Sequence, residues 1–177
     1  MNLPTDEIYD LVLLQLRTIE KIAKEKNTRL NHVKPHGALY NISAREPRVA
    51  QAIALAVKDF NDDLILFVLS NSHCVEQATN LNLKTAMEVF ADRTYQDDGS
   101  LTPRSQPNAL IHDVNESVQQ ILQMIREKTV NSVSGKTIPI IADTICIHGD
   151  GKHAVEFAKT IHQVLKNEGI KIKSREG

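Results

Sequence analysis

The sequence predicts an α/β fold built on a parallel sheet. Three observations support this prediction. Amphipathic segments with helical spacing alternate with short apolar runs along the chain, which is the order of βα units. The run 64–69 is apolar at every position, as in a strand buried on both faces. The length of 177 residues is typical of one domain with its own core.

The first helix and the first strand occupy the start of the chain. Thr5 can cap this helix and Asn27 can stop it. The helical spacing predicts an apolar face made of Ile8, Leu11, Val12, Leu16, Ile19, Ile22 and Ala23. We expect the strand over residues 30–34.

The next elements complete the first half of the chain. Ser43 and Glu46 have the spacing of a capping box, which predicts a helix that ends at residue 60. Strands over 64–69 and 84–90 then flank a short helix over 73–80.

The second half begins with a long polar stretch. Residues 91–112 contain no predicted helix or strand, and loops of this length in compact domains are usually functional or disordered. Asp113 and Glu116 form a capping pair for the helix that follows. Further along we expect a strand over 138–147, a turn over 148–151, a helix from residue 154 with Gly169 just after its end, and a final strand over 170–172.

Chain length bears on how the sheet closes. A complete (β/α) barrel typically needs about 250 residues, so this chain is roughly 70 short. Its four clear strands are compatible with a small open sheet. They are equally compatible with the later part of a barrel whose first strands are absent.

Composition excludes several classes of protein. Lys+Arg 21 and Asp+Glu 22 give a net charge of −1, which argues against nucleic-acid binding through a broadly basic surface. No apolar run is long enough to cross a membrane, and we expect no signal peptide. Cys74 and Cys146 lack metal-ligand spacing, so we expect reduced thiols and a cytoplasmic location. A net charge near zero does little to oppose self-association, and we expect a homo-oligomer.

Ionisable residues gather where parallel α/β folds bind ligands, beyond the carboxyl ends of the strands. These positions hold Lys34, His36, Gly37, Ser70, Asn71, Ser72, His73, Glu88, Asp92, Arg93, His148, Gly149 and Asp150. Each has a structural alternative: His36 can bond a backbone carbonyl, and Asp150 can cap the last helix. A buried Glu88 needs a partner, which Lys34 or Arg93 can provide.

Two other kinds of site receive little support. A metal site from His36, Glu88, His148 and Asp150 is chemically possible, but the spacing does not favour it, and we predict none. The stretch 134–137 (SGKT) resembles the end of a P-loop. However, Val130 stands where that motif needs glycine, so we interpret the stretch as a turn.

Three blocks of sequence resemble one known family. They are HVKPHGALYN at 32–41, EVFADRTYQDDGSLTPRSQPNALI at 88–111 and ADTICIHGDGKHAVEFA at 142–158. Together they resemble the family of the 5-oxoprolinase A subunit, also called the LamB/YcsF lactam-utilisation family, over essentially the whole chain. The resemblance implies a (β/α) barrel of the glycoside hydrolase/deacetylase type. The family's N-terminal Asn-x-Asp-x-Gly-Glu, Gly-Phe-His-Ala-Gly-Asp and Gly-Ala-His-Pro motifs do not occur here.

We therefore expect an incomplete barrel, with residues 1–177 as one α/β domain that corresponds to the C-terminal two thirds of the 5-oxoprolinase A subunit. The resemblance implies ATP-dependent opening of the lactam 5-oxo-L-proline (pyroglutamate) to L-glutamate, together with subunits B and C. ATP, which Mg²⁺ can accompany, would be a co-substrate, and no tightly bound cofactor is expected.

The resemblance also points to particular residues. The expected catalytic residues are Lys34, His36, Asp92, His148 and Asp150. The expected substrate- and phosphate-binding residues are Gly37, Tyr40, Asn41, Glu88, Arg93, Arg104, Ser105, Gly149 and Gly151.

The chemistry suggests roles for some of them. His36 or His148 has a suitable ordinary pKa for a general base, and Asp92 or Asp150 can orient it. Lys34, Arg93 and the turn at 149–151 can contact phosphate. Two alternatives stay open: a catalytically incompetent, truncated remnant that keeps its fold and its partners, and a metal-dependent amide hydrolase or deacetylase that acts alone.

Overall fold

The structure is a computed structural model that describes residues 3–149 and 154–174. It divides into two compact units, residues 1–87 with 176–177 and residues 88–175. We call them unit 1 and unit 2. The boundary falls inside strand β3 (Thr85–Phe90). Each unit combines helices with parallel strand pairing, as the sequence predicts, and each is described by itself below.

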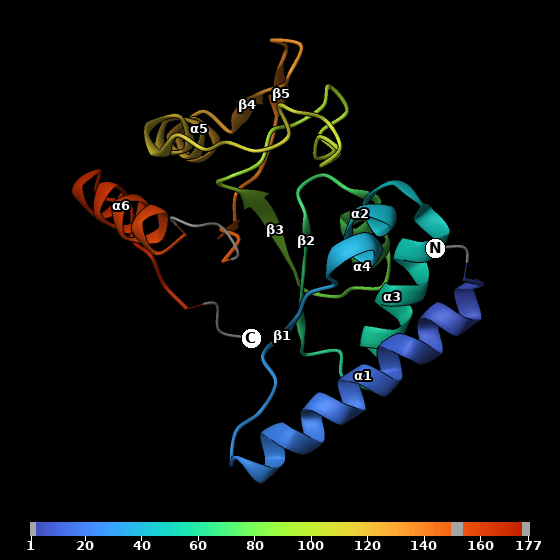
Figure 1. Cartoon of the computed structure of the whole chain (residues 1–177). Coiled ribbons are helices and arrows are strands. Elements are labelled where there is room, and N and C mark those ends of the chain that lie inside the picture. The colour runs from blue at the N-terminus through green and yellow to red at the C-terminus, as the bar shows by residue number, and fades with distance from the viewer. Residues whose placement is uncertain (1–2, 150–153, 175–177) are drawn as a thin grey trace. The chain divides into compact units, whose positions relative to one another are not determined.

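Unit 1 packs helices against a short parallel sheet (Figure 1). Strand β1 pairs with β2 in parallel, with His32 opposite Ile65 and Val33 opposite Leu66. The amide of Leu66 in β2 donates to the carbonyl of Lys84 at 2.9 Å. Lys84 directly precedes β3. The elements before β3 are α1 (Thr5–Glu25), β1 (His32–Val33), α2 (Gly37–Arg45), α3 (Pro47–Phe60), β2 (Ile65–Leu69) and α4 (His73–Asn80).

Helix α3 lies at the centre of the unit 1 core, in contact with α1, α2 and α4. Its alanines at 50, 52, 54 and 56 are all buried, and such small side chains let neighbouring elements approach closely. Pro47 occupies the first turn, where a missing N–H costs nothing. After the helix, Asn61 Oδ1 accepts the amide of Asp63 at 3.0 Å, a side-chain bond that stabilises the turn before β2.

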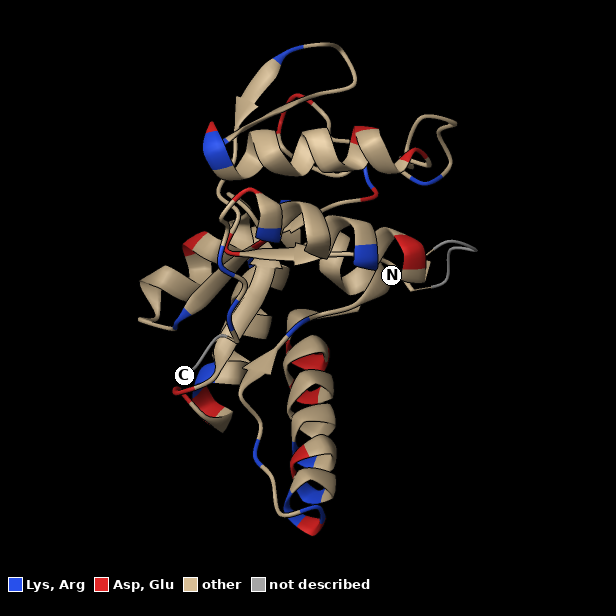
Figure 2. Ribbon diagram, turned by 90° about the vertical axis from the view of Figure 1, so that its left-hand side faces the viewer, with Lys and Arg blue, Asp and Glu red and all other residues tan. Residues whose placement is uncertain are grey.

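Helix α1 begins and ends close to its predicted limits. Pro4, not Thr5, is the N-cap residue, and Asn27 adopts a φ of 52° just after the helix. Its predicted apolar face is only partly covered, because Leu11, Ile19 and Ile22 are 36%, 52% and 49% exposed. Figure 2 shows acidic residues near the start of α1 and mixed charges along its second half.

The capping box predicted in unit 1 is wrong. Ser43 lies inside α2, which the sequence did not predict, and its hydroxyl donates to the carbonyl of Tyr40 at 3.0 Å. Glu46 is itself the N-cap residue of α3, without a side-chain capping bond. The physical reason is Gly37, whose φ of +61° lets the chain turn directly from the end of β1 into a helix.

Unit 2 contains the second half of β3, paired in parallel with β6. Glu88, Val89 and Phe90 lie opposite Thr144, Ile145 and Cys146. The strand order along the sheet is β1-β2-β3-β6. The other elements are α5 (Val114–Arg126), β4 (Thr129–Asn131), β5 (Thr137–Pro139), β6 (Thr144–Cys146) and α6 (Ala154–Asn167).

The single strand predicted over 138–147 is wrong. The structure divides this stretch into β5, which pairs antiparallel with β4, and β6, which pairs with β3. Pro139 has no N–H for a continued ladder, so it suits the end of a short hairpin strand. Gly135, with a φ of +88°, lies in the hairpin turn, which confirms the predicted turn except at Thr137, the first residue of β5.

Both helices of unit 2 were predicted near their observed positions. Asp113 caps α5, because its Oδ1 accepts the amides of Asn115 and Glu116 at 2.8 and 3.0 Å. Gly169 follows α6 with a φ of +72°, as a C′ glycine does. The final strand predicted over 170–172 is not formed. Within the described ranges, no helix has the length and apolar character needed to cross a membrane.

Candidate functional site

The carboxyl ends of β3 and β6 bring an aspartate and a histidine together in unit 2. Asp92 follows β3 by two residues and His148 follows β6 by two, and the two strands are parallel neighbours. The backbone amide of His148 donates to Asp92 Oδ2 at 3.1 Å. His148 Nδ1 lies 3.0 and 2.9 Å from the two carboxylate oxygens. Two predicted catalytic residues therefore form one bidentate pair.

Their surroundings favour the ionised carboxylate. Partial burial disfavours the charge of Asp92, but the hydrogen bonds from His148 outweigh that effect and hold the pKa of Asp92 below its ordinary value. Phe90 stacks on the imidazole of His148 with centroids 5.6 Å apart. A carboxylate at Nδ1 favours the tautomer whose lone pair is on Nε2, the form that can accept a proton from a substrate.

Arg93 has a different place from the one expected of a phosphate ligand. It is 4% exposed, its Nε donates to the carbonyl of Ala109 at 3.2 Å, and its Nη2 donates to that of Thr102 at 2.5 Å. Burial, and then the nearby charge of Arg104, lower the pKa of Arg93. These bonds make Arg93 the anchor of the 91–112 segment, which is ordered rather than structureless.

Other contacts fix the same segment. Tyr95 is fully buried and its hydroxyl oxygen accepts the amide of Phe90 at 2.8 Å. Asp97 Oδ1 accepts the hydroxyls of Ser132 and Ser134 at 2.5 and 2.6 Å, which join the segment to the β4–β5 hairpin and lower the pKa of Asp97. Sequence reasoning missed Tyr95, since an aromatic residue within a polar stretch gives no periodic signal.

The remaining predicted residues of unit 2 differ in their exposure. Glu88 is 3% exposed on β3, so an acidic side chain is buried there as predicted. Arg104, Ser105 and Gly149 are exposed. The predicted residues Asp150 and Gly151 lie outside the described residues.

The predicted residues of unit 1 lie around the start of α2. Lys34 Nζ lies 5.6 Å from the centre of the Tyr40 ring, within range of a cation–π contact. Asn41 Nδ2 donates to the carbonyl of Gly37 at 3.0 Å. His36 is the exposed N-cap residue of α2. Lys34 and His36 also line a cavity of about 410 Å³ between α1 and β1, whose other walls are mainly apolar.

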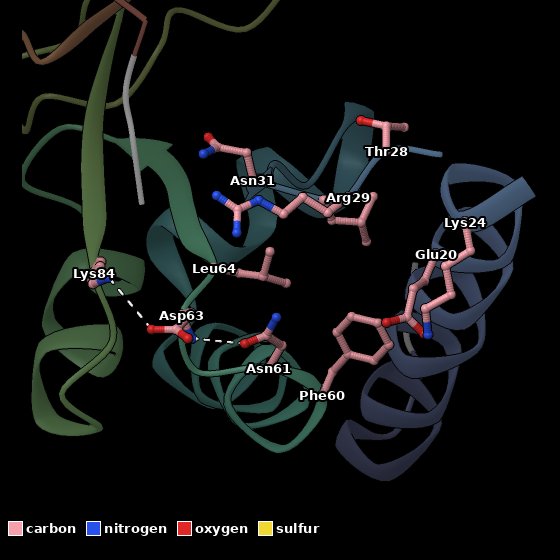
Figure 3. A pocket seen from close by; sticks show the side chains of 11 residues that line it. Glu20, Lys24, Thr28, Arg29, Asn31, Phe60, Asn61, Asp63, Leu64 and Lys84 are labelled. Carbon is pink, nitrogen blue, oxygen red and sulfur yellow. Dashed lines mark hydrogen bonds and ion pairs between the residues drawn. The ribbon is translucent and has the colours of Figure 1, made fainter. Parts of the chain in front are cut away.

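A second cavity in unit 1, of about 260 Å³, lies at the amino ends of the strands, and residues just before β1, β2 and β3 line it. Figure 3 shows Arg29 and Asn31 from the segment before β1, and Asp63 and Lys84 from the turns before β2 and β3. Lys84 and Asp63 form an ion pair at 3.7 Å. Because catalytic groups in such folds lie at the carboxyl ends of strands, we do not assign this cavity to the candidate site.

The candidate site offers carboxylate and imidazole groups. Within residues 3–149 and 154–174, no three His, Cys, Asp or Glu side chains are close enough to hold a metal ion together.

The LamB/YcsF family matches residues 1–177.

The chain belongs to the LamB/YcsF family.

Two of its relatives carry the same name. It is 49% identical over 176 residues to the 5-oxoprolinase A subunit of Oceanobacillus iheyensis, a match that covers 99% of this chain and 68% of that protein. It is 48% identical over 174 residues to the 5-oxoprolinase A subunit of Tolumonas auensis, covering 98% and 69%. The crystal structure of the lactam utilization protein from Thermus thermophilus matches with a TM-score of 0.89 and 36% identity, over 99% of this chain and 70% of that one.

The LamB/YcsF assignment confirms both the predicted family and the predicted fold class. The fold is α/β of the incomplete (β/α) barrel type, and it superposes on a family structure over almost its whole length. The curated LamB/YcsF relatives are longer, since the chain spans 68% of the Oceanobacillus protein and 69% of the Tolumonas protein.

Proposed function

We propose that this chain acts as the A subunit of a 5-oxoprolinase, which opens 5-oxo-L-proline to L-glutamate at the expense of ATP in a complex with subunits B and C. One observation carries the proposal: the Asp92–His148 pair lies at the carboxyl ends of paired parallel strands. The near-half sequence identity to proteins named as the A subunit of 5-oxoprolinase supports it.

The chemistry needs an activated carbonyl, because amide resonance makes a lactam a poor electrophile. Transfer of the γ-phosphoryl group of ATP to the lactam oxygen releases ADP and activates the ring carbon. Water then adds to that carbon, the C–N bond breaks, and the nitrogen takes a proton. A second water hydrolyses the resulting acyl phosphate to glutamate and phosphate.

His148 suits the water-activating role. Its Nε2 accepts the proton of the attacking water as a general base. Asp92 holds Nδ1 and stabilises the imidazolium that forms, as the aspartate of a catalytic triad does. Gly149, which is exposed directly after His148, is the proposed phosphate contact of this mechanism, while Arg93 anchors the neighbouring segment.

The test is turnover by the reconstituted complex. The chain is mixed with subunits B and C of a 5-oxoprolinase, and ADP and glutamate are measured with and without 5-oxoproline. General-base catalysis contributes about 10²–10⁴-fold, so His148→Asn should lower the 5-oxoproline-dependent rate at least about tenfold. His162→Asn, an exposed histidine on α6, is the matched control and should leave the rate unchanged. Equal rates for both variants would remove His148 from the mechanism.

A second candidate function is binding to subunits B and C without catalysis of the reaction. Co-purification with B and C but no 5-oxoproline-dependent ADP release would favour this candidate. A separate sedimentation measurement on the chain alone tests the predicted homo-oligomer.

A further inference from the structure

Helix α5 reaches the strand end that carries Asp92 through one amide side chain. Gln120 is half-buried on α5. Its Nε2 donates to the carbonyl of Phe90 at 3.1 Å and to the carbonyl of Arg93 at 3.0 Å. These two acceptors lie on either side of Asp92 in the chain, so a single side chain spans the segment 90–93.

The carbonyls between them are also engaged from outside the segment. Ser117, one turn earlier on α5, donates its hydroxyl to the carbonyl of Ala91 at 2.6 Å. The amide of Ile111 donates to the carbonyl of Asp92 at 3.0 Å. Every carbonyl from residue 90 to residue 93 therefore has a donor, and the backbone that aims the Asp92 carboxylate is held at four consecutive points.

Gln120 adjoins the buried side of α5. Ser117, Ile121 and Met124 on the same side of α5 are buried, and an apolar residue at position 120 would pack there without desolvating an amide. A partly buried amide lowers stability unless its hydrogen bonds are made. Both bonds of Gln120 go to the backbone beside Asp92, which indicates that its contribution is geometric.

We infer that Gln120 is a positioning residue, which acts through the 90–93 backbone to hold Asp92 in its bidentate contact with His148. The catalytic part of this inference rests on the proposed function. The structural part does not, because the Asp92–His148 contact can be measured without turnover. Small displacements of a catalytic group are costly, since a misplacement of about 1 Å can lower a rate about 100-fold.

The test compares two glutamines that are neighbours on one helix. Gln120→Met keeps the length of the side chain and removes its N–H donors. Gln119→Met is the matched control, because Gln119 is exposed on the same turn. The carboxyl carbon of Asp92 is titrated by NMR in each variant, and the imidazole nitrogens of His148 are recorded at neutral pH.

We expect the pKa of Asp92 to rise towards its ordinary value in Gln120→Met and to stay unchanged in Gln119→Met. In the complex with subunits B and C, kcat of Gln120→Met should fall about tenfold while KM for 5-oxoproline changes little, the sign of a lost transition-state interaction. An unchanged Asp92 titration and an unchanged His148 spectrum in folded Gln120→Met would overturn the inference.

The outcomes separate this inference from the proposed function. If the wild-type complex shows no turnover but Asp92 titrates differently in Gln120→Met, the positioning role stands and the proposed function fails. If Gln120→Met does not fold, Ser117→Ala removes the neighbouring donor with little change in size. A rise of the Asp92 pKa towards its ordinary value in Ser117→Ala then supports the inference. An unchanged Asp92 pKa in that variant refutes it.

Discussion

Replacement of Arg93 by methionine separates an anchoring role from a phosphate-binding role. The substitution keeps an apolar stem and removes the two hydrogen bonds to the carbonyls of Thr102 and Ala109. Hydrogen bonds from charged donors contribute about 1.5–3 kcal/mol each, and both carbonyls lose a buried partner. Relief of the buried guanidinium charge offsets part of this loss. We therefore expect Arg93→Met to lower the free energy of unfolding by about 3 kcal/mol, the low end of the summed range.

The measurement is urea denaturation followed by far-UV circular dichroism, with amide hydrogen exchange of residues 91–112 as a local probe. Arg48→Met, an exposed arginine on α3, is the control, and substitutions at such surface positions usually change stability by less than about 0.5 kcal/mol. The anchoring argument is refuted if Arg93→Met is as stable as this control and exchange in 91–112 is unchanged. A raised KM for ATP with unchanged stability would instead support phosphate binding by Arg93.

Two further predictions concern ionisation. Because the pKa of Asp92 is lowered in the folded state, its ionised form stabilises the fold above the unfolded value of about 3.9, and this contribution is lost as pH falls through the folded value. The difference in free energy of unfolding between wild type and Asp92→Asn should thus shrink below about pH 4. Denaturation curves at pH 3 and pH 7 measure this difference. A difference that is the same at both pH values contradicts the stabilising role of the ionised Asp92. Burial raises the pKa of the Cys74 thiol to about 11. At pH 8, Cys74 in the folded protein should therefore react with a disulfide reagent far more slowly than Cys74 in the urea-unfolded protein. The Cys74→Ser variant identifies the signal of this thiol. Equal rates in the two states would show that the fold does not protect the thiol.

The sequence predicted the parts of the fold that periodic burial determines. Helix α3 and strand β2 are buried along regular positions, so their apolar patterns located strand β2 and the end of α3 within one residue. Helix α2 was missed because its start depends on the positive φ of Gly37, and no periodic pattern reports a single backbone angle. The capping box failed because Ser43 and Glu46 have the right spacing but belong to two successive helices.

The candidate site was only partly predictable for a related reason. Asp92 and His148 follow strands, and the rule that ligands bind at strand ends brings them together. The roles of Arg93 and Gln120 depend on which backbone carbonyls face them, and carbonyls are the same in every residue. A sequence therefore shows that these polar side chains exist but does not show which acceptors they meet.

The two hydrogen bonds of Arg93 affect how far the amino-acid sequence of the 91–112 segment can vary. Its acceptors are main-chain carbonyls of Thr102 and Ala109, which any amino acid supplies. The six residues between them, 103–108, are all exposed. Substitutions along this tip can accumulate without loss of the anchor, so it can diverge between relatives while its base stays fixed. For protein engineering, positions 103 and 106–108 are therefore the ones to randomise, with Arg93 and the predicted binding residues Arg104 and Ser105 kept constant.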